Sequence, residues 1–264
     1  MYPFQRLSNT WAVLITLTRQ ELRRTYAGSL MGTYWYSLYR LIFLGSYCVA
    51  YLYFARDRSP DAGAVGAERI FGVLATIIPY LAVTETIQAA STALFQGSQL
   101  IRGARLKVEL LPLRSVLIAL LGQLITICLL LIALAVLGEL RPEALILLPA
   151  LLVETVLLCG IAFFIAPLGA LIPDIRIALP LLLYFIFFVA PVTQELSDIN
   201  NPIVRQIMLF NPVYHMLLIF RNALIQGSLS SGQSWLIFIL FSSAIFLTGY
   251  LSFARLKRAL VDYV

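Results

Sequence analysis

The chain has 264 residues, of which 61% are hydrophobic and only 12% are charged. Soluble domains carry roughly 45–50% apolar and about 25% charged residues, so a water-soluble fold of this length could not bury its apolar surface. The composition excludes a soluble enzyme, a nucleic-acid-binding protein and a disordered chain, and it predicts an all-α membrane protein. The net charge of +6 is typical of a membrane protein with basic cytoplasmic loops.

The first predicted element is an amphipathic helix over residues 7–27. One face carries Trp11, Leu14, Leu22 and Tyr26. The polar residues Arg19, Gln20, Arg23 and Arg24 fall mostly on the opposite face. Such a helix lies in the headgroup plane rather than crossing the bilayer. We therefore assign residues 1–32 to an interfacial helix on the cytoplasmic leaflet, whose anionic lipids attract the arginines. The alternative is a soluble cap packed on a partner.

Six transmembrane spans are predicted within one membrane domain that covers residues 1–264. The spans lie at about 33–55, 70–93, 114–137, 144–172, 177–192 and 235–254. Spans one to five occupy residues 33–192, and residues 235–264 hold the sixth span and a cytoplasmic tail. The fourth span contains Pro149 and Pro167, which predict a kink or a tilt.

The basic residues predict the orientation. With both termini inside, 12 of the 19 Arg and Lys residues fall on inner segments, 6 fall on outer segments, and Arg40 is intramembrane. The positive-inside rule then places both ends of the chain in the cytoplasm.

Residues 193–234 form an outer segment that we expect to be re-entrant. Proline disfavours a helical conformation at the residue before it, so two short helices should meet at Asn211-Pro212. Each is too short to span, and re-entrant backbone is tolerated only where protein or water covers it. A surface helix lying flat is the alternative.

No nucleotide or hydrolase motif is present. The chain has only Lys107 and Lys257 as lysines, and neither follows a glycine-rich phosphate loop. The lone histidine, His215, has no second histidine for a metal and no Gly-x-Ser-x-Gly motif. We expect no enzyme activity and no bound cofactor or metal, so any ATP would be hydrolysed by another subunit.

Two charged residues fall inside predicted spans at matching depths. Arg40 in the first span and Glu85 in the second lie roughly 10–12 Å from the cytoplasmic edge. A bare charge there costs on the order of 2.5–3.5 kcal/mol, so we expect them to pair; a direct substrate contact is the alternative. Glu154, nearer the outer half, has no obvious partner.

An aromatic stripe follows one side of the first span beside Arg40. Its members are Tyr36, Tyr39, Phe43, Tyr47, Tyr51 and Phe54. Such a stripe is usually packing, but ordered rings also suit a track on which sugar rings slide, and buried phenols need hydrogen-bond partners. An opposing wall could come from Tyr184, Phe187 and Phe188.

The inner loop after the second span, residues 95–115, is basic and compatible with a helix that stops at Pro112. An exposed basic helix on the inner side is a natural contact for a cytosolic motor; a purely topogenic loop is the alternative. The expected motor-coupling residues are Arg102, Arg105, Lys107, Arg23 and Arg24.

Because these features follow one another in this order, the chain resembles the membrane subunit of ABC-type polysaccharide exporters. The resembling segments are RQELRRTYAGSLMGTYW (19–35), QLIRGARLKVELLPLRSVL (99–117), LIPDIRIALPLLL (171–183) and LFNPVYHMLLIFRNALIQG (209–227). The first follows the family pattern through Arg23, Tyr26, Ser29, Gly32 and Trp35, and the last holds the Asn211-Pro212 and Arg221 signature of an outer gate. Many relatives carry Phe-Pro in the coupling segment, where this chain has Leu106-Lys107.

The resemblance implies a homodimer that forms one channel in the bacterial inner membrane, with two copies of a cytosolic ATP-binding subunit that uses ATP and magnesium. The cargo would be a long, lipid-linked polysaccharide of the capsule, O-antigen or teichoic-acid type. Periplasmic and outer-membrane export components are further implied partners, and nucleic acid is not. The alternatives are a drug or lipid exporter of the same fold, an ion-coupled secondary transporter, or an intramembrane enzyme that requires His215.

Overall fold

The computed structural model describes residues 3–56, 63–97, 107–189, 202, 206 and 209–263. Within these ranges the chain is helical and contains no strand. The elements are α1 (Pro3–Thr25), α2 (Tyr34–Arg56), α3 (Gly63–Gln96), α5 (Leu110–Val136), the 3-10 helix η1 (Pro142–Ile146), α6 (Leu147–Leu171), α7 (Pro173–Val189), α9 (Pro212–Arg221), the π-helical turn η3 (Asn222–Gln226) and α10 (Gly232–Tyr263).

The prediction of an all-helical membrane protein is confirmed at this level. A helix occupies each of the six predicted span positions. Four segments in the described part of the chain are long and apolar enough to cross a membrane, namely Ile70–Gln96, Leu110–Val136, Pro142–Leu171 and Gly232–Lys257. The boundaries differ from the predicted ones mainly in α3, which begins at Gly63, and in α10, which continues to Tyr263.

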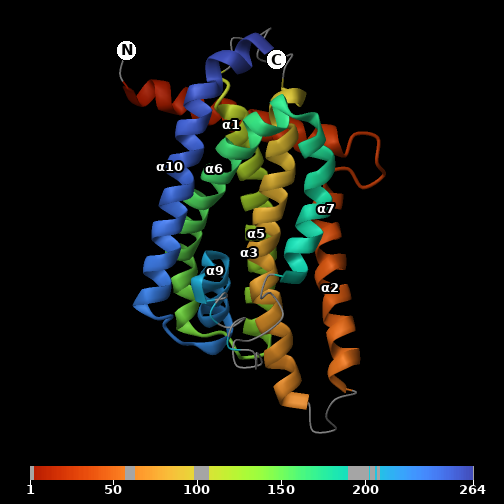
Figure 1. Cartoon of the computed structure of the whole chain (residues 1–264). Coiled ribbons are helices and arrows are strands. Elements are labelled where there is room, and N and C mark those ends of the chain that lie inside the picture. The colour runs from red at the N-terminus through yellow and green to blue at the C-terminus, as the bar shows by residue number, and fades with distance from the viewer. Residues whose placement is uncertain are drawn as a thin grey trace.

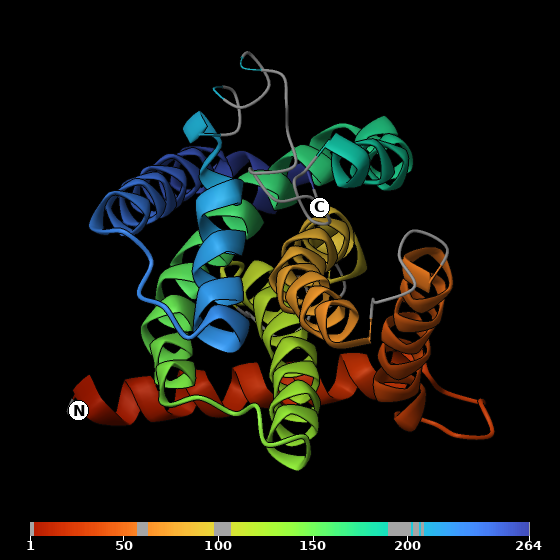
Figure 2. The same ribbon diagram turned by 90° about the horizontal axis from the view of Figure 1, so that it is seen from below.

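Helix α1 lies across the end of the bundle at which the chain terminates, nearly perpendicular to the long helices (Figures 1 and 2). Its buried face is narrow, because Leu14 and Leu17 pack against Leu110 at the start of α5. An ion pair of 3.1 Å between Glu21 and Arg114 ties the same two helices together. The amphipathic pattern of α1 therefore serves a contact with α5 as well as an exposed side.

Small residues let the central helices approach closely. A Cβ atom at Gly160 of α6 would lie 2.5 Å from the backbone of Phe246 in α10. A Cβ atom at Gly169 would likewise overlap the backbone of Ser91 in α3. Such glycine contacts are typical of helix packing in membranes, where backbones rather than long side chains meet. Helices α3, α6 and α10 therefore form a closely packed centre.

Helix α9 is short and inserts among the long helices in the half of the bundle that lies away from α1 (Figure 1). Asn211 caps it, since its Oδ1 accepts a hydrogen bond from the Val213 N–H at 3.0 Å. Pro212 follows as the first helical residue, where its missing N–H costs nothing. The helix buries Met216, Ile219 and other apolar residues in the main core, so it does not lie flat on the surface of the bundle.

Candidate functional site

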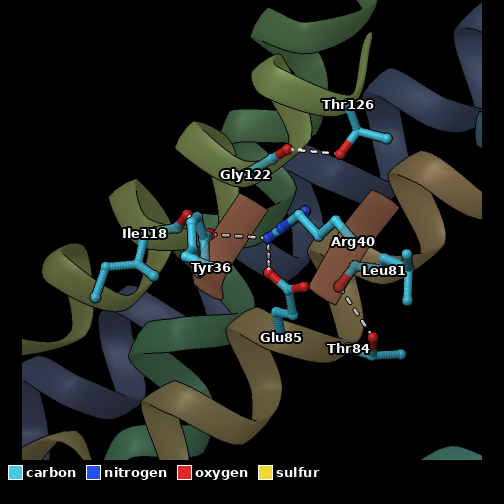
Figure 3. Close-up of polar contacts among 8 residues, drawn as sticks. All are labelled: Tyr36, Arg40, Leu81, Thr84, Glu85, Ile118, Gly122 and Thr126. Carbon is cyan, nitrogen blue, oxygen red and sulfur yellow. Dashed lines mark hydrogen bonds and ion pairs between the residues drawn. The ribbon is translucent and has the colours of Figure 1, made fainter. Parts of the chain in front are cut away.

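The most distinctive polar cluster joins α2 to α3 and α5 around Arg40 (Figure 3). Only 2% of Arg40 is exposed, and its Nη2 forms an ion pair with Glu85 Oε2. The same nitrogen donates a hydrogen bond of 2.8 Å to the Tyr36 hydroxyl. The Arg40 Cζ lies 4.7 Å from the centroid of the Tyr36 ring. The two residues whose depths predicted a pair thus meet across the α2–α3 interface.

Tyr36 extends the cluster to α5. Its hydroxyl accepts from Arg40 and donates to the backbone carbonyl of Ile118. Gly122, one turn further along α5, leaves the space that the Arg40 guanidinium fills, because a Cβ atom there would overlap the guanidinium. The cluster is a three-helix joint in which α2 is fixed by one cation, one carboxylate and one phenol.

A charge at this depth needs partners, since an unpaired one would cost several kcal/mol. The Arg40 Nε has no hydrogen-bond partner among the described residues. The charge of Arg40 is therefore compensated through the contacts of Nη2 with Glu85 and Tyr36 and through the ring of Tyr36. The Glu85 side chain retains 29% exposure in the single chain. The joint can therefore hold α2 in place and present one edge of a carboxylate.

The members of the predicted aromatic stripe differ in their exposure. Tyr36 faces α5, and Phe43 is partly buried against the main core. Tyr39 is 64% exposed and stacks on Phe43 with ring centroids 6.4 Å apart. The side chains of Tyr47, Tyr51, Phe54, Tyr184, Phe187 and Phe188 lie outside the described residues.

Helices α2 and α7 both lie on the side of α3 that faces away from α10 (Figures 1 and 2). Helix α2 packs on α3 and α5, and α7 packs on α3 and α6. Both carry apolar side chains that are exposed in the single chain. They are Tyr39, Leu41, Ile42, Val49 and Tyr53 on α2, and Ile177, Leu181, Leu182 and Phe185 on α7.

The predicted motor-coupling residues that the structure describes gather at the α1 end. Arg23 and Arg24 are exposed in the last turn of α1, and Lys107 is exposed just before α5. Arg102 and Arg105 lie outside the described residues. The prediction that a helix stops at Pro112 is wrong, because Pro112 lies in the first turn of α5.

A second ion pair at this end joins Glu109, which precedes α5, to Lys257 near the end of α10. Burial by itself raises the pKa of the Glu109 carboxyl. The hydrogen bond from Lys257, a backbone hydrogen bond and the charges of Lys257 and Lys107 outweigh that effect. The pKa of Glu109 therefore lies below its ordinary value.

The predicted outer-gate residues all belong to α9 or its cap. Asn211 and Pro212 begin the helix and Arg221 ends it. The Arg221 guanidinium lies against Gly72 of α3, where a Cβ atom would be 3.1 Å from Nη2. At the last residue of η3, the Gln226 carbonyl accepts a hydrogen bond of 3.0 Å from Arg141. These contacts attach α9 to α3 and to the segment that precedes α6.

One buried polar pair was missed by the sequence reasoning. Glu154 of α6 and Gln123 of α5 are both 0% exposed, and Gln123 Nε2 donates to Glu154 Oε2 at 2.6 Å. Glu154 Oε1 and Gln123 Oε1 have no partner among the described residues. The available signal was depth, because both positions fall well inside the consecutive helices α5 and α6.

His215 is buried on α9, and its Nε2 lies 2.8 Å from the Leu209 carbonyl. Among the described residues no group of three or more His, Cys, Asp or Glu side chains could hold a metal ion. The surroundings of His215 are those of a packed residue with one backbone partner.

No protein-family model matches the chain, and no curated protein is significantly similar to it.

Proposed function

We propose that the chain is the membrane subunit of an ATP-driven exporter that moves a long, lipid-linked polysaccharide out of the cytoplasm. The observation that carries the proposal is the placement of α2. This helix follows the basic helix α1, is attached to the bundle by the Tyr36–Arg40–Glu85 joint, and carries exposed apolar side chains on the same side of α3 as α7. In the proposal, this open side meets a second copy, and the two copies enclose the polysaccharide path.

In this account the six predicted spans correspond to α2, α3, α5, α6, α7 and α10, with both termini in the cytoplasm of a bacterial inner membrane. Helix α1 lies in the cytoplasmic interface, and α9 is the re-entrant outer gate with Asn211, Pro212 and Arg221. The exposed ring of Tyr39 and the other rings of the stripe contact sugars without holding them tightly. Arg40 positions α2 rather than touching the cargo.

Coupling to a separate motor would act through the start of α5. Two copies of a cytosolic ATP-binding subunit would push on residues 95–112 and on the basic end of α1. The start of α5 is tied to α1 by Glu21–Arg114 and to α10 by Glu109–Lys257, so a push there moves these helices together. Packed helices move as rigid bodies between discrete arrangements, and such a motion would open the path beside α2 and α7.

A deletion strain tests the proposed cargo. We expect its surface polysaccharide to be lost and the lipid-linked polymer to accumulate inside the cell, with both effects reversed by the wild-type gene. A Tyr39→Ala/Tyr53→Ala variant should restore export only in part, whereas a matched Leu236→Ala/Leu240→Ala variant, altered on exposed positions of α10, should restore it fully. Unchanged surface polysaccharide in the deletion strain would favour a drug or lipid exporter instead.

A further inference from the structure

A groove of about 600 Å³ runs between α1 and α5 on the exposed side of α1. Its walls are formed by Trp11, Ile15 and Leu22 from α1 and by Leu117 and Leu121 from α5. This volume falls within the range of about 300–1,000 Å³ that is usual for ligand pockets. The groove is therefore large enough for a ligand and is lined mainly by apolar side chains.

The apolar walls are not closed by the chain itself. Trp11 is 56% and Ile15 is 60% exposed, and Leu121 is also exposed. On α5, Leu121 lies one turn further from α1 than Leu117, so the apolar wall continues from the end of the bundle along the length of a membrane-spanning helix. An apolar chain lying against this wall would point toward the middle of the membrane.

Two cationic residues border this apolar groove. Arg19 and Arg23 both line it and lie one turn apart on the same face of α1. Neither arginine forms an ion pair with a described residue, in contrast to Arg114, which pairs with Glu21. Two guanidinium groups at this spacing suit a phosphate, which accepts several N–H hydrogen bonds at once. The groove thus has two arginines at its border and an apolar wall that continues along α5.

We propose that the groove between α1 and α5 binds an anionic glycerophospholipid of the leaflet that contacts α1. Arg19 and Arg23 hold its phosphate, and an acyl chain lies along Leu117 and Leu121. The bound lipid fills the space under α1 and fixes the angle of α1 to α5. This inference does not depend on the exported cargo, because it requires only that the α1 end of the bundle lie at a membrane surface.

Trp11 provides the reporter for the test. A Trp35→Phe/Trp235→Phe protein retains Trp11 as its single tryptophan, and it is reconstituted in two sets of vesicles made from equal amounts of phosphatidylglycerol and phosphatidylcholine. In one set only the phosphatidylglycerol carries brominated acyl chains, which quench nearby tryptophan fluorescence, and in the other only the phosphatidylcholine does. The ratio of the two quenching constants measures the preference of the groove for the anionic lipid.

We expect brominated phosphatidylglycerol to quench Trp11 roughly 25-fold more strongly, because each of the two arginines near an anionic headgroup contributes about 1 kcal/mol, or about fivefold. Arg19→Gln/Arg23→Gln should bring the ratio close to one. The matched Arg255→Gln variant changes an exposed arginine of α10 that does not line the groove, and it should leave the ratio unchanged. A protein with Trp235 as its single tryptophan should give a ratio near one.

Three results would overturn the inference. A ratio near one in the parent protein would show that the groove does not select an anionic lipid. If the Arg19→Gln/Arg23→Gln protein kept the preference for phosphatidylglycerol, the two arginines would not be the residues that bind the lipid. If neither lipid quenched Trp11, protein rather than lipid would fill the groove, as expected for a second copy of the chain or a cytosolic subunit seated there.

Discussion

The backbone of Gly122 in α5 lies directly against the guanidinium of Arg40 in α2, so that a Cβ atom at position 122 would overlap Nη2, Cζ and Nε (Figure 3). The absence of a side chain at one residue thus allows a buried cation to reach its carboxylate on a third helix. The position of α2, on which the proposed path depends, rests on this contact.

Gly122→Ala should displace the Arg40 guanidinium and weaken its ion pair with Glu85. Overpacking of a filled site typically costs about 1–3 kcal/mol, and we expect a loss of stability in that range, measured by thermal unfolding in detergent micelles. Gly45→Ala on α2 is the matched control, because nothing lies within 4 Å of a Cβ atom there. Equal stability of the two variants would show that the close contact does not constrain α2.

The ion pair itself is tested by a double-mutant cycle with Arg40→Met and Glu85→Gln. Removing one partner of a buried pair leaves the other uncompensated and typically costs about 3–5 kcal/mol. The double variant should be less destabilised than the sum of the two single variants, because it leaves neither charge unpaired. If the loss of stability of the double variant equalled the sum of the two single losses, the Arg40–Glu85 pair would not contribute to stability. Arg255→Met combined with Glu85→Gln should be additive, since Arg255 is exposed on α10.

The buried Gln123–Glu154 contact predicts an unusual order of stabilities. Gln123→Leu should destabilise the protein by about 1–3 kcal/mol, because Glu154 would lose the 2.6 Å hydrogen bond from Nε2 and remain buried without a partner. Gln123→Leu/Glu154→Leu should recover most of this loss, since replacing both partners by apolar groups can be nearly neutral. A double variant less stable than the single one, measured by the same unfolding assay, would contradict this account.

The Glu109–Lys257 ion pair predicts an acid-sensitive contribution to stability. The folded-state pKa of Glu109 lies below its ordinary value of 4.5, so the contribution is fully present above pH 4.5 and is lost as the pH falls through the folded-state pKa. Glu109→Gln should therefore lower the melting temperature at pH 7 and have progressively less effect below pH 4.5. A difference between wild type and variant that persists unchanged at low pH would rule out this origin.

Local signals in the sequence were sufficient for some features. Asn211-Pro212 predicts the start of a helix because proline restrains the residue before it and fits the first helical turn, and α9 does begin there. Depth along a span was enough to associate Arg40 with Glu85, because two buried charges of opposite sign have few ways to be compensated. The first prediction depends only on neighbouring residues in the sequence. The second depends only on how deep each residue lies along its span.

Features that depend on helix rotation and packing were not predictable in the same way. Tyr36 and Tyr39 are three residues apart, yet one is hydrogen-bonded to α5 and the other is exposed. The partner of Glu154 depends on which faces α5 and α6 turn toward each other. Pro112 was expected to stop a helix, but a proline in the first turn of the next helix has the same sequence signature, and the structure places it in α5.

The central claim is that two copies of this chain, which has no nucleotide-binding loop of its own, work with a separate ATP-binding motor. The most direct measurement is the native mass of the complex isolated from its own membranes through an affinity tag on this chain. The account predicts two copies of the chain together with two copies of a cytosolic ATP-binding subunit. A complex that contains a single copy of the chain, or no nucleotide-binding subunit, would contradict it.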